Sequence, residues 1–171
     1  ELTVWEGTEL YNYASFIRSD HCNNIAITGK GIINGNAKTT FARMRPQRSA
    51  QQDTLRQMGI DLVPVRDRYF GARSIMPPNM IEPFGCKNVL IEGVTIHDSP
   101  YWVIHPLFCD NVTVRGVTID SWNRKNDGCD PEYTTNVLIE DCVFNTGDDA
   151  IAIKAGRDQD AWRIGQKTAN I

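Results

Sequence analysis

Four segments of the chain share one pattern of apolar and polar positions. Each begins with Asn, continues through three mainly β-branched or aliphatic residues and one polar residue, and ends in Gly or Asp. The four segments are residues 24–29, 88–93, 111–116 and 136–141. The last three start at residues 88, 111 and 136, which are 23 and 25 residues apart, and a second short apolar segment follows each of them, at 94–96, 117–119 and 142–144.

Two short strands with turn residues between them, repeated about every two dozen residues, predict one coil of a solenoid. A coil cannot bury its apolar side alone, so successive coils stack as parallel strands about 4.8 Å apart and share one core. We therefore predict an all-β fold, a right-handed parallel β-helix, in a single domain over residues 1–171. The recurrent Asn residues would form a hydrogen-bonded ladder, and one buried column would contain Ile25, Val89, Val112 and Val137.

Residues 37–74 interrupt this repeat. Residues 47–58 are polar, rich in Arg and compatible with a helix, and several Pro and Gly residues follow. Eight of the eighteen Lys and Arg residues fall between Lys38 and Arg73, against three acids, so a local basic face is possible. We predict a helical or irregular insertion at 37–74, lying against the solenoid either beside a cleft or as a solvated surface helix.

The five cysteines fit the repeat better than they fit a disulfide framework, because their number is odd and no CxxC pair occurs. Cys22, Cys86 and Cys109 each lie two positions before a repeat Asn, in the place that Thr134 and Thr168 take in later coils. Free Cys behaves as a small apolar residue. We therefore predict a stacked column of small buried side chains, in preference to a disulfide or a reactive thiol.

The composition is that of a globular domain, with 171 residues, 41% hydrophobic and 23% charged, and a formal net charge of −3. No apolar run is long enough to predict a membrane span, and the first residues do not have the pattern of a signal peptide. The chain does not begin with Met, and residues 168–171 repeat the opening of a coil found at 134–137. We expect a piece of a longer protein, truncated at its C-terminal end.

Two acidic clusters, at 126–131 and 147–154, contain Asp127, Asp148 and Asp149. Asp149 follows Asp127 by 22 residues, close to one coil, so these carboxylates should be neighbours along the solenoid axis. Crowded carboxylates separate their titrations, and cleavage of a glycosidic bond needs one carboxyl as acid and another to activate water or attack the sugar. The alternative is ordinary turn chemistry, because Asp and Gly are common turn formers.

With these clusters and several other motifs the sequence resembles glycoside hydrolase family 28, the polygalacturonases and their relatives. The resemblance extends over nearly the whole chain. Its motifs are Trp5-Glu6-Gly7, the repeats at 24–29 and 88–96, Ser99-Pro100, Trp102, Ile104-His105-Pro106 and both Asp clusters.

The resemblance implies an inverting hydrolase that acts on α-1,4-linked galacturonic acid. Asp148 then resembles the general acid, while Asp127 and Asp149 resemble the pair that positions and deprotonates water. It also implies a polysaccharide substrate and a secreted or periplasmic parent protein that acts as a monomer, without cofactor, metal, nucleic acid or membrane.

Four further residues are candidates for substrate binding: Lys154, His105, Trp102 and Asn126. His105 and Trp102 could form a wall on which a sugar stacks, although a lone His is more often a packed or solvated residue. Lys154 could meet a substrate carboxylate or neutralise its acidic neighbours. The three His residues have no matched spacing, which argues against a zinc site.

The sequence also departs from the family. Lys125-Asn126 stands where the family commonly has Asn-Thr, and the family's downstream Gly-His-Gly and Arg-Ile-Lys are absent. We attribute the absence to truncation and expect the isolated chain to be nearly inactive. Two other functions stay open, a polysaccharide lyase that uses Ca²⁺ and an Arg base, and a β-helix that binds carbohydrate without catalysis.

Overall fold

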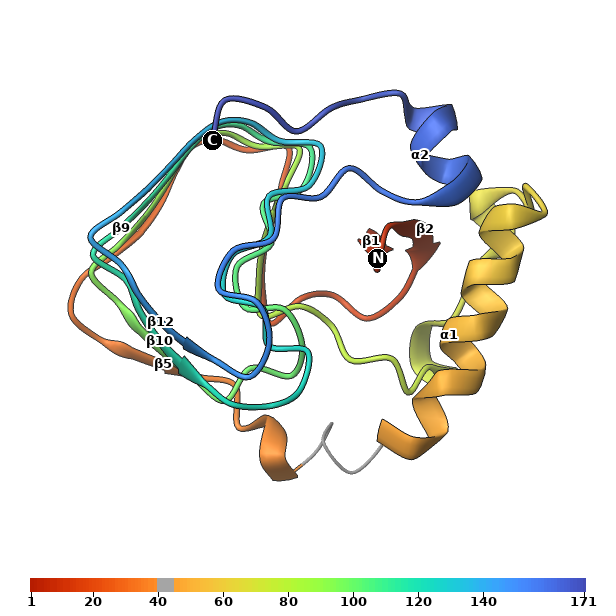
Figure 1. Ribbon diagram of the computed structural model, residues 1–171, viewed down its shortest axis with the longest axis horizontal. Helices are drawn as coiled ribbons and strands as arrows, with labels where there is room; N and C mark the ends of the chain where they lie inside the picture. Colours follow the sequence, from red (N-terminus) through yellow and green to blue (C-terminus); the bar gives the residue numbers. More distant parts are fainter. Residues whose placement is uncertain (40–44) are drawn as a thin grey trace.

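The computed structural model describes residues 1–39 and 45–171. The chain opens with an antiparallel hairpin, β1 (Leu2–Trp5) and β2 (Thr8–Tyr11), and then winds in stacked coils. Seen along the stack, the coils nearly superimpose (Figure 1). All strand pairing between coils is parallel in the described residues, so the fold is all-β and forms a parallel β-helix.

Each coil contributes strands to up to three sides of the stack. One side has the order β11-β9-β7-β4, the second β12-β10-β8-β5, and the third contains β3 and β6. The bounds are β3 (Ile17–Asp20), β4 (Asn23–Thr28), β5 (Ile32–Asn34), β6 (Ile81–Phe84), β7 (Lys87–Glu92), β8 (Thr95–His97), β9 (Asp110–Arg115), β10 (Thr118–Ser121), β11 (Thr135–Glu140) and β12 (Val143–Thr146).

The predicted apolar column is confirmed by the strand register. Ile25 pairs with Val89, Val89 with Val112, and Val112 with Val137. The three valines are buried, while Ile25 is only half-buried in the first coil of the stack. Alternate residues of each strand point inward, so the period-two pattern of the sequence becomes a shared core.

Each recurrent Asn is the second residue of its strand, at a position where the backbone is left-handed. Asn88 and Asn111 have φ of 55° and 59°, a region that Asn tolerates better than most residues. Asn111 Nδ2 donates to Asn88 Oδ1 over 2.7 Å, and Asn88 Nδ2 donates to Asn24 Oδ1 over 2.8 Å. The ladder is interrupted at Asn136, whose Nδ2 donates to Asp110 Oδ1.

The predicted column of small side chains also forms, and its members accept hydrogen bonds from the backbone of a neighbouring coil. Cys109 N donates to Thr134 Oγ1 over 3.0 Å, and Thr134 N donates to Thr168 Oγ1 over 3.3 Å. All five cysteines are free. Cys86 and Cys109 are buried, but the prediction is wrong for Cys22, which is exposed because it lies in the first coil.

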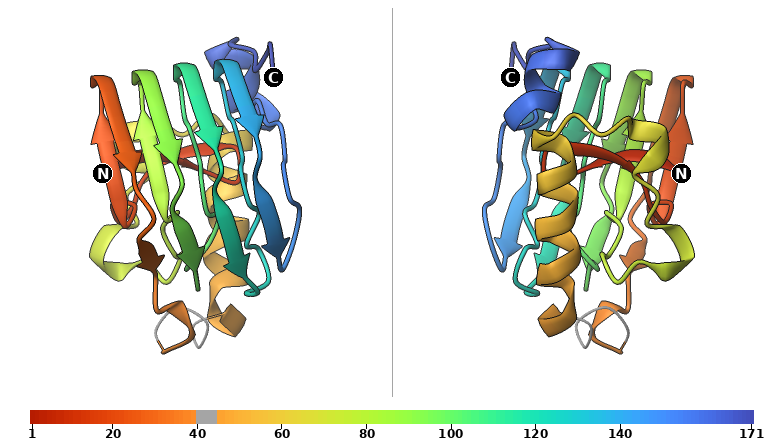
Figure 2. Two further views of the ribbon diagram at one scale, coloured as in Figure 1. Left: turned by 90° about the vertical axis from the view of Figure 1, so that its left-hand side faces the viewer. Right: turned by 90° about the vertical axis from the view of Figure 1, so that its right-hand side faces the viewer.

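The described part of residues 37–74 contains helices and no named strand, and 40–44 of the predicted insertion lie outside the described residues. The helices are η1 (Ala37–Thr39), α1 (Arg45–Ile60), η3 (Val65–Asp67) and η4 (Gly71–Arg73). α1 packs against β2 and against α2 (Asp158–Ile164), on the side of the molecule that carries the hairpin (Figure 2).

This helix is more than a solvated surface element. Leu55 of α1 is 1% exposed and belongs to a second core cluster. The cluster also contains Trp5 of the hairpin and the aromatic pair Tyr101 and Trp102. Neither α-helix of the described chain is long and apolar enough to cross a membrane.

Candidate active site

The candidate aspartates lie on the third side of the stack, where isolated bridges continue the parallel pairing. Gly128 N donates to the carbonyl oxygen of Asp149 over 2.9 Å, so Asp149 lies one coil from Asp127, as its sequence separation predicts. A Cβ at Gly128 would come within 2.5 Å of the carbonyl oxygen of Ala150. The glycine after Asp127 is therefore needed for close stacking of the two coils.

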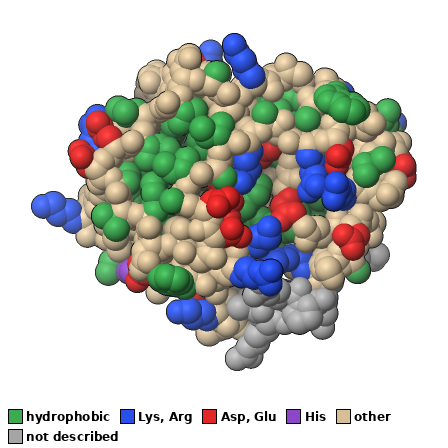
Figure 3. Space-filling view, in the orientation of Figure 1, with side chains coloured by type: hydrophobic (Ala, Val, Ile, Leu, Met, Phe, Trp, Pro, Cys, Tyr) green, Lys and Arg blue, Asp and Glu red, His purple; other side chains and the backbone are tan. Residues whose placement is uncertain are grey.

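These aspartates line a surface cleft of about 460 Å³. Asp148 and Asp149 are exposed, whereas Asp127 is 5% exposed. Acidic and basic side chains gather side by side on the face seen in Figure 3. The residues that line the cleft are Glu6, Gly7, Trp102, Lys125, Asp127, Glu132, Asp148, Asp149, Ile153, Lys154, Ala155, Gly156 and Arg157.

Lys154 neutralises its acidic neighbours, the second of the two roles considered for it. Its Nζ donates to Asp127 Oδ2 over 3.0 Å and lies 3.1 Å from Asp130 Oδ1. The same ammonium lies 4.3 Å from the centre of the Trp102 ring, a cation–π contact. Burial lowers the pKa of Lys154, but the charges of Asp130 and Asp127 outweigh this effect and raise it.

Asp127 has the features of a reactive carboxylate. Burial raises its pKa, the ion pair with Lys154 opposes this rise, and the nearby charge of Asp148 adds to it. Its Oδ1 is buried and has no hydrogen-bond partner among the described residues. One oxygen of Asp127 is thus fixed by Lys154, while the other is left without a partner.

Asp130 belongs to the same group, although sequence reasoning did not select it. It is fully buried, and burial raises its pKa well above the usual range despite the charge of Lys154. The one available signal was its position three residues after Asp127. That spacing could not show that Lys154 of the next coil would lie between the two carboxylates.

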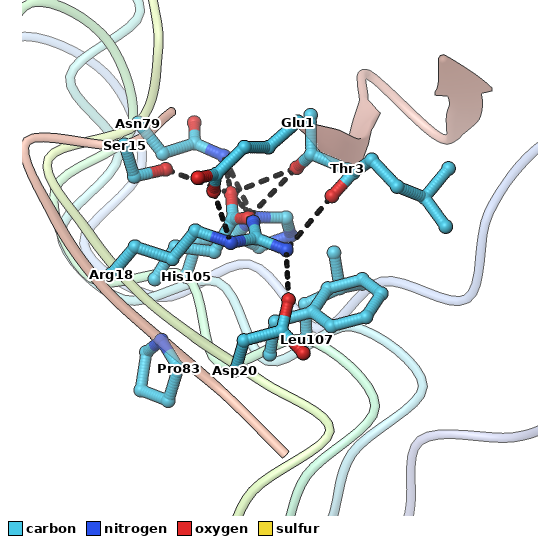
Figure 4. Close-up of polar contacts among 12 residues, drawn as sticks. Glu1, Thr3, Ser15, Arg18, Asp20, Asn79, Pro83, His105 and Leu107 are labelled. Carbon is cyan, nitrogen blue, oxygen red and sulfur yellow. Dashed lines mark hydrogen bonds and ion pairs between the residues drawn. The ribbon is translucent and has the colours of Figure 1, made fainter. Parts of the chain in front are cut away.

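His105 is fully buried, the packed position that a lone His more often takes, so it offers a sugar no surface on which to stack. Its Nε2 lies 2.9 Å from Glu132 Oε2, and its Nδ1 lies 3.4 Å from Glu82 Oε2. Burial lowers the pKa of His105, but the hydrogen bonds and charges of Glu132 and Glu82 outweigh it and raise the pKa to about 9. Figure 4 shows His105 in this polar cluster, close to Arg18, which forms an ion pair with Glu82.

Asn126 is also fully buried and is not among the residues that line the cleft. Its Nδ2 donates to the carbonyl oxygens of Tyr101 and Ser99, over 2.6 and 3.1 Å, and its Oδ1 accepts from Ser121 Oγ over 2.6 Å. Asn126 therefore fixes the turn that leads into Asp127.

Trp102 reaches the cleft but is 4% exposed. Lys154 lies over its ring, and Tyr101 stacks against it with the ring centres 5.5 Å apart. The ring therefore supports Lys154 and offers a sugar little free surface.

Within residues 1–39 and 45–171, no group of three or more His, Cys, Asp or Glu residues is arranged to hold a metal ion. The fold and the cleft together define a parallel β-helix with clustered carboxylates on one side. The sequence model of the glycosyl hydrolases family 28 matches residues 71–165. The chain belongs to this family.

Individual relatives agree with this assignment. A probable polygalacturonase of Vitis vinifera is 34% identical over 162 residues, which cover 93% of this chain and 28% of that protein. The crystal structure of a hyperthermoactive exopolygalacturonase from Thermotoga maritima is 38% identical, with a TM-score of 0.97 over 100% of this chain and 41% of that one.

A more distant structure shows the fold alone. The polygalacturonase from Erwinia carotovora ssp. carotovora is 22% identical, with a TM-score of 0.68, over 96% of this chain and 39% of that one. The chain thus spans less than half the length of each of these three relatives.

Proposed function

We propose that the complete protein hydrolyses α-1,4 bonds between galacturonic acid residues of polygalacturonan. The observation that carries this proposal is the carboxylate group in the cleft: Asp127, buried, with a raised pKa and one unpartnered oxygen, close to the exposed Asp148 and Asp149. The family and the polygalacturonase relatives support the same activity.

Asp148 is assigned as the general acid, which gives its proton to the leaving glycosidic oxygen. Asp127 and Asp149 hold the attacking water, and a carboxylate of this pair takes a proton from it. A raised pKa makes the Asp127 carboxylate a stronger base, while Lys154 favours its ionised form. The carbon–oxygen bond to the leaving sugar breaks as the bond to water forms, so one proton is given and one is taken in each turnover.

This division of roles implies inversion at the anomeric carbon. An inverting enzyme holds its acid and base about 6.5–9.5 Å apart, which leaves room for the water between base and sugar. The open cleft and the exposed position of Asp148 are compatible with a polymer chain lying across the site.

Further properties of the complete protein belong to this proposal. The coils are right-handed, as nearly all crossovers between parallel strands are, and residues 37–74 are an insertion in them. The complete protein is secreted or periplasmic, because a polysaccharide does not cross a membrane to reach an enzyme inside the cell. It acts as a monomer without a cofactor.

The central test is Asp148→Asn in the full-length protein. Loss of the proton donor should lower kcat on polygalacturonate by roughly 10²–10⁴ while KM changes far less. Asp141→Asn is the matched control, because Asp141 is exposed in a turn outside the cleft and its φ of 54° suits Asn as well as Asp. Unchanged turnover in the Asp148 variant would remove it as the acid.

Product analysis separates the competing functions. A lyase would leave an unsaturated, ultraviolet-absorbing end and would lose activity with a chelator, whereas a hydrolase releases a saturated reducing end. A β-helix that only binds carbohydrate would show no turnover before or after mutation. The isolated 171-residue chain should release little reducing sugar, and robust hydrolysis by it would show that the absent downstream motifs are dispensable.

A further inference from the structure

One wall of the cleft is built by two segments that are far apart in the sequence. The turn at Glu6 and Gly7, from the N-terminal hairpin, packs against Gly156 and Arg157. Arg157 N donates to the carbonyl oxygen of Gly7 over 3.1 Å. A Cβ at Gly7 would lie 2.9 Å from Arg157 N, so the two backbones are in direct contact.

The same backbone is fixed from the core side. Gly156 N donates to Oε1 of Glu132, which is fully buried and whose other oxygen contacts His105. A Cβ at Gly156 would collide with the hydroxyl of Tyr133 at 1.7 Å. The backbone that carries the Arg157 side chain is therefore held on both sides, the condition for placing a binding group accurately.

The guanidinium of Arg157 has little of its binding capacity used within the described chain. Its Nε is buried and makes no hydrogen bond, although it lies 3.3 Å from Asp158 Oδ2, its one ion-pair partner among the described residues. The side chain is 32% exposed and lines the cleft. By contrast, Lys154 is occupied by two aspartates, and Lys125 lies 3.4 Å from Glu6 Oε1.

A substrate that carries a carboxylate on each ring meets three aspartates in this cleft and needs a cation to offset their repulsion. We infer that Arg157 binds the carboxylate of a uronic acid ring held beside the catalytic aspartates. Its planar donors match the two oxygens of a carboxylate. This inference rests on the proposed function for the identity of the substrate.

The test compares Arg157→Gln with the unmodified full-length protein on oligogalacturonate. Loss of a charged hydrogen-bonded contact should raise KM on the order of 10- to 100-fold and leave kcat within about threefold, since the contact is made before and during reaction. Arg157→Lys keeps the positive charge but not the planar pair of donors, so its KM should lie between that of Arg157→Gln and that of the unmodified protein. On methyl-esterified substrate, where the carboxylate charge is absent, the variant and the unmodified protein should have similar KM.

Arg56→Gln is the matched control, because Arg56 Nε lies 3.4 Å from the same Asp158 oxygen but its side chain is outside the cleft. It should leave KM unchanged. A KM within twofold of the unmodified value for Arg157→Gln would overturn the inference. An equal rise in KM on esterified and acidic substrates would overturn it too, because that pattern indicates a structural effect of the substitution.

Direct binding separates this inference from the proposed function. In an Asp148→Asn background, calorimetry with trigalacturonate should show weaker binding on the order of 10- to 100-fold when Arg157 is replaced by Gln. If the unmodified full-length protein fails to hydrolyse polygalacturonate, the proposed activity is refuted, while the binding comparison still decides the role of Arg157. Equal binding with and without the guanidinium would refute that role.

Discussion

Lys154→Met should destabilise the protein, and the loss should depend on pH. The substitution keeps a side chain of similar length over the Trp102 ring but removes the cation between Asp127 and Asp130. Both carboxylates are buried, at 6% and 0% side-chain exposure, so water cannot replace the lost ammonium well.

The structure sets the size of this effect. Breaking a buried ion pair by removing one partner costs about 3–5 kcal/mol, and the lower end applies because Lys154 itself is 21% exposed. The alternative is that one carboxyl becomes neutral by binding a proton. This protonation costs about 1.4 kcal/mol for each pH unit above the unfolded pKa, or about 4 kcal/mol at pH 7. We therefore expect a loss of about 3 kcal/mol in unfolding free energy at pH 7.

The direction of the pH dependence follows from the raised pKa values of Asp127 and Asp130. A carboxyl with a raised pKa binds its proton more tightly when folded, so stability falls as pH rises from the unfolded pKa through the folded one. Without Lys154 both folded values rise further, and this loss becomes larger. Near pH 3 both carboxyls are protonated in the folded and unfolded states, and the difference from the unmodified protein should nearly vanish.

Urea unfolding at pH 3, 5 and 7, followed by tryptophan fluorescence, measures this difference. Arg115→Met is the matched control, because Arg115 also lies between two carboxylates, those of Glu92 and Glu140, but is 44% exposed. Its loss should be under about 1 kcal/mol at pH 7. If Lys154→Met costs no more than this control, or costs the same at pH 3 as at pH 7, the assigned role of Lys154 is wrong.

Two further predictions concern His105 and the cysteines. Because the pKa of His105 is raised from 6.5 to about 9, its charged form should contribute roughly 3 kcal/mol below pH 6.5 that is lost as pH rises through 9. The unfolding free energy of His105→Gln, measured with urea, should not fall with pH in this way. An equal pH dependence in both proteins would contradict the assignment. A thiol reagent should modify exposed Cys22 in the folded protein but not Cys109, which is buried with its pKa raised to about 12. Rapid modification of Cys109 itself, located by mass spectrometry of the peptides, would contradict the buried column.

Much of the fold could be predicted from the sequence, because the coil repeats the same local requirements. The alternation of apolar residues defines which side of each strand faces the core, and the repeat length brings Val89 and Val112 into register. The recurring Asn marks a left-handed backbone position near the start of a strand, since few other residues adopt that backbone without cost. The one-coil spacing of Asp127 and Asp149 follows from the same repeat length.

The family resemblance was likewise available from the sequence, but the surroundings of single residues were not. His105 and Asn126 have the polarity of binding residues, and the structure buries both. Exposure depends on what packs against a residue from other coils, and spacing along one coil does not describe that packing.

The cleft shows most clearly which features the sequence determined and which only the tertiary structure decided. The sequence alone determined that the aspartates would lie on neighbouring coils, because their positions follow from a repeat that each coil carries within itself. Only the tertiary structure decided that Lys154 would lie between Asp127 and Asp130 and that Gly7 would contact Arg157. The hairpin lies outside the repeat, so no periodicity encodes where it docks; its position is set by burial of Trp5 against Tyr101 and by the side chains it meets there.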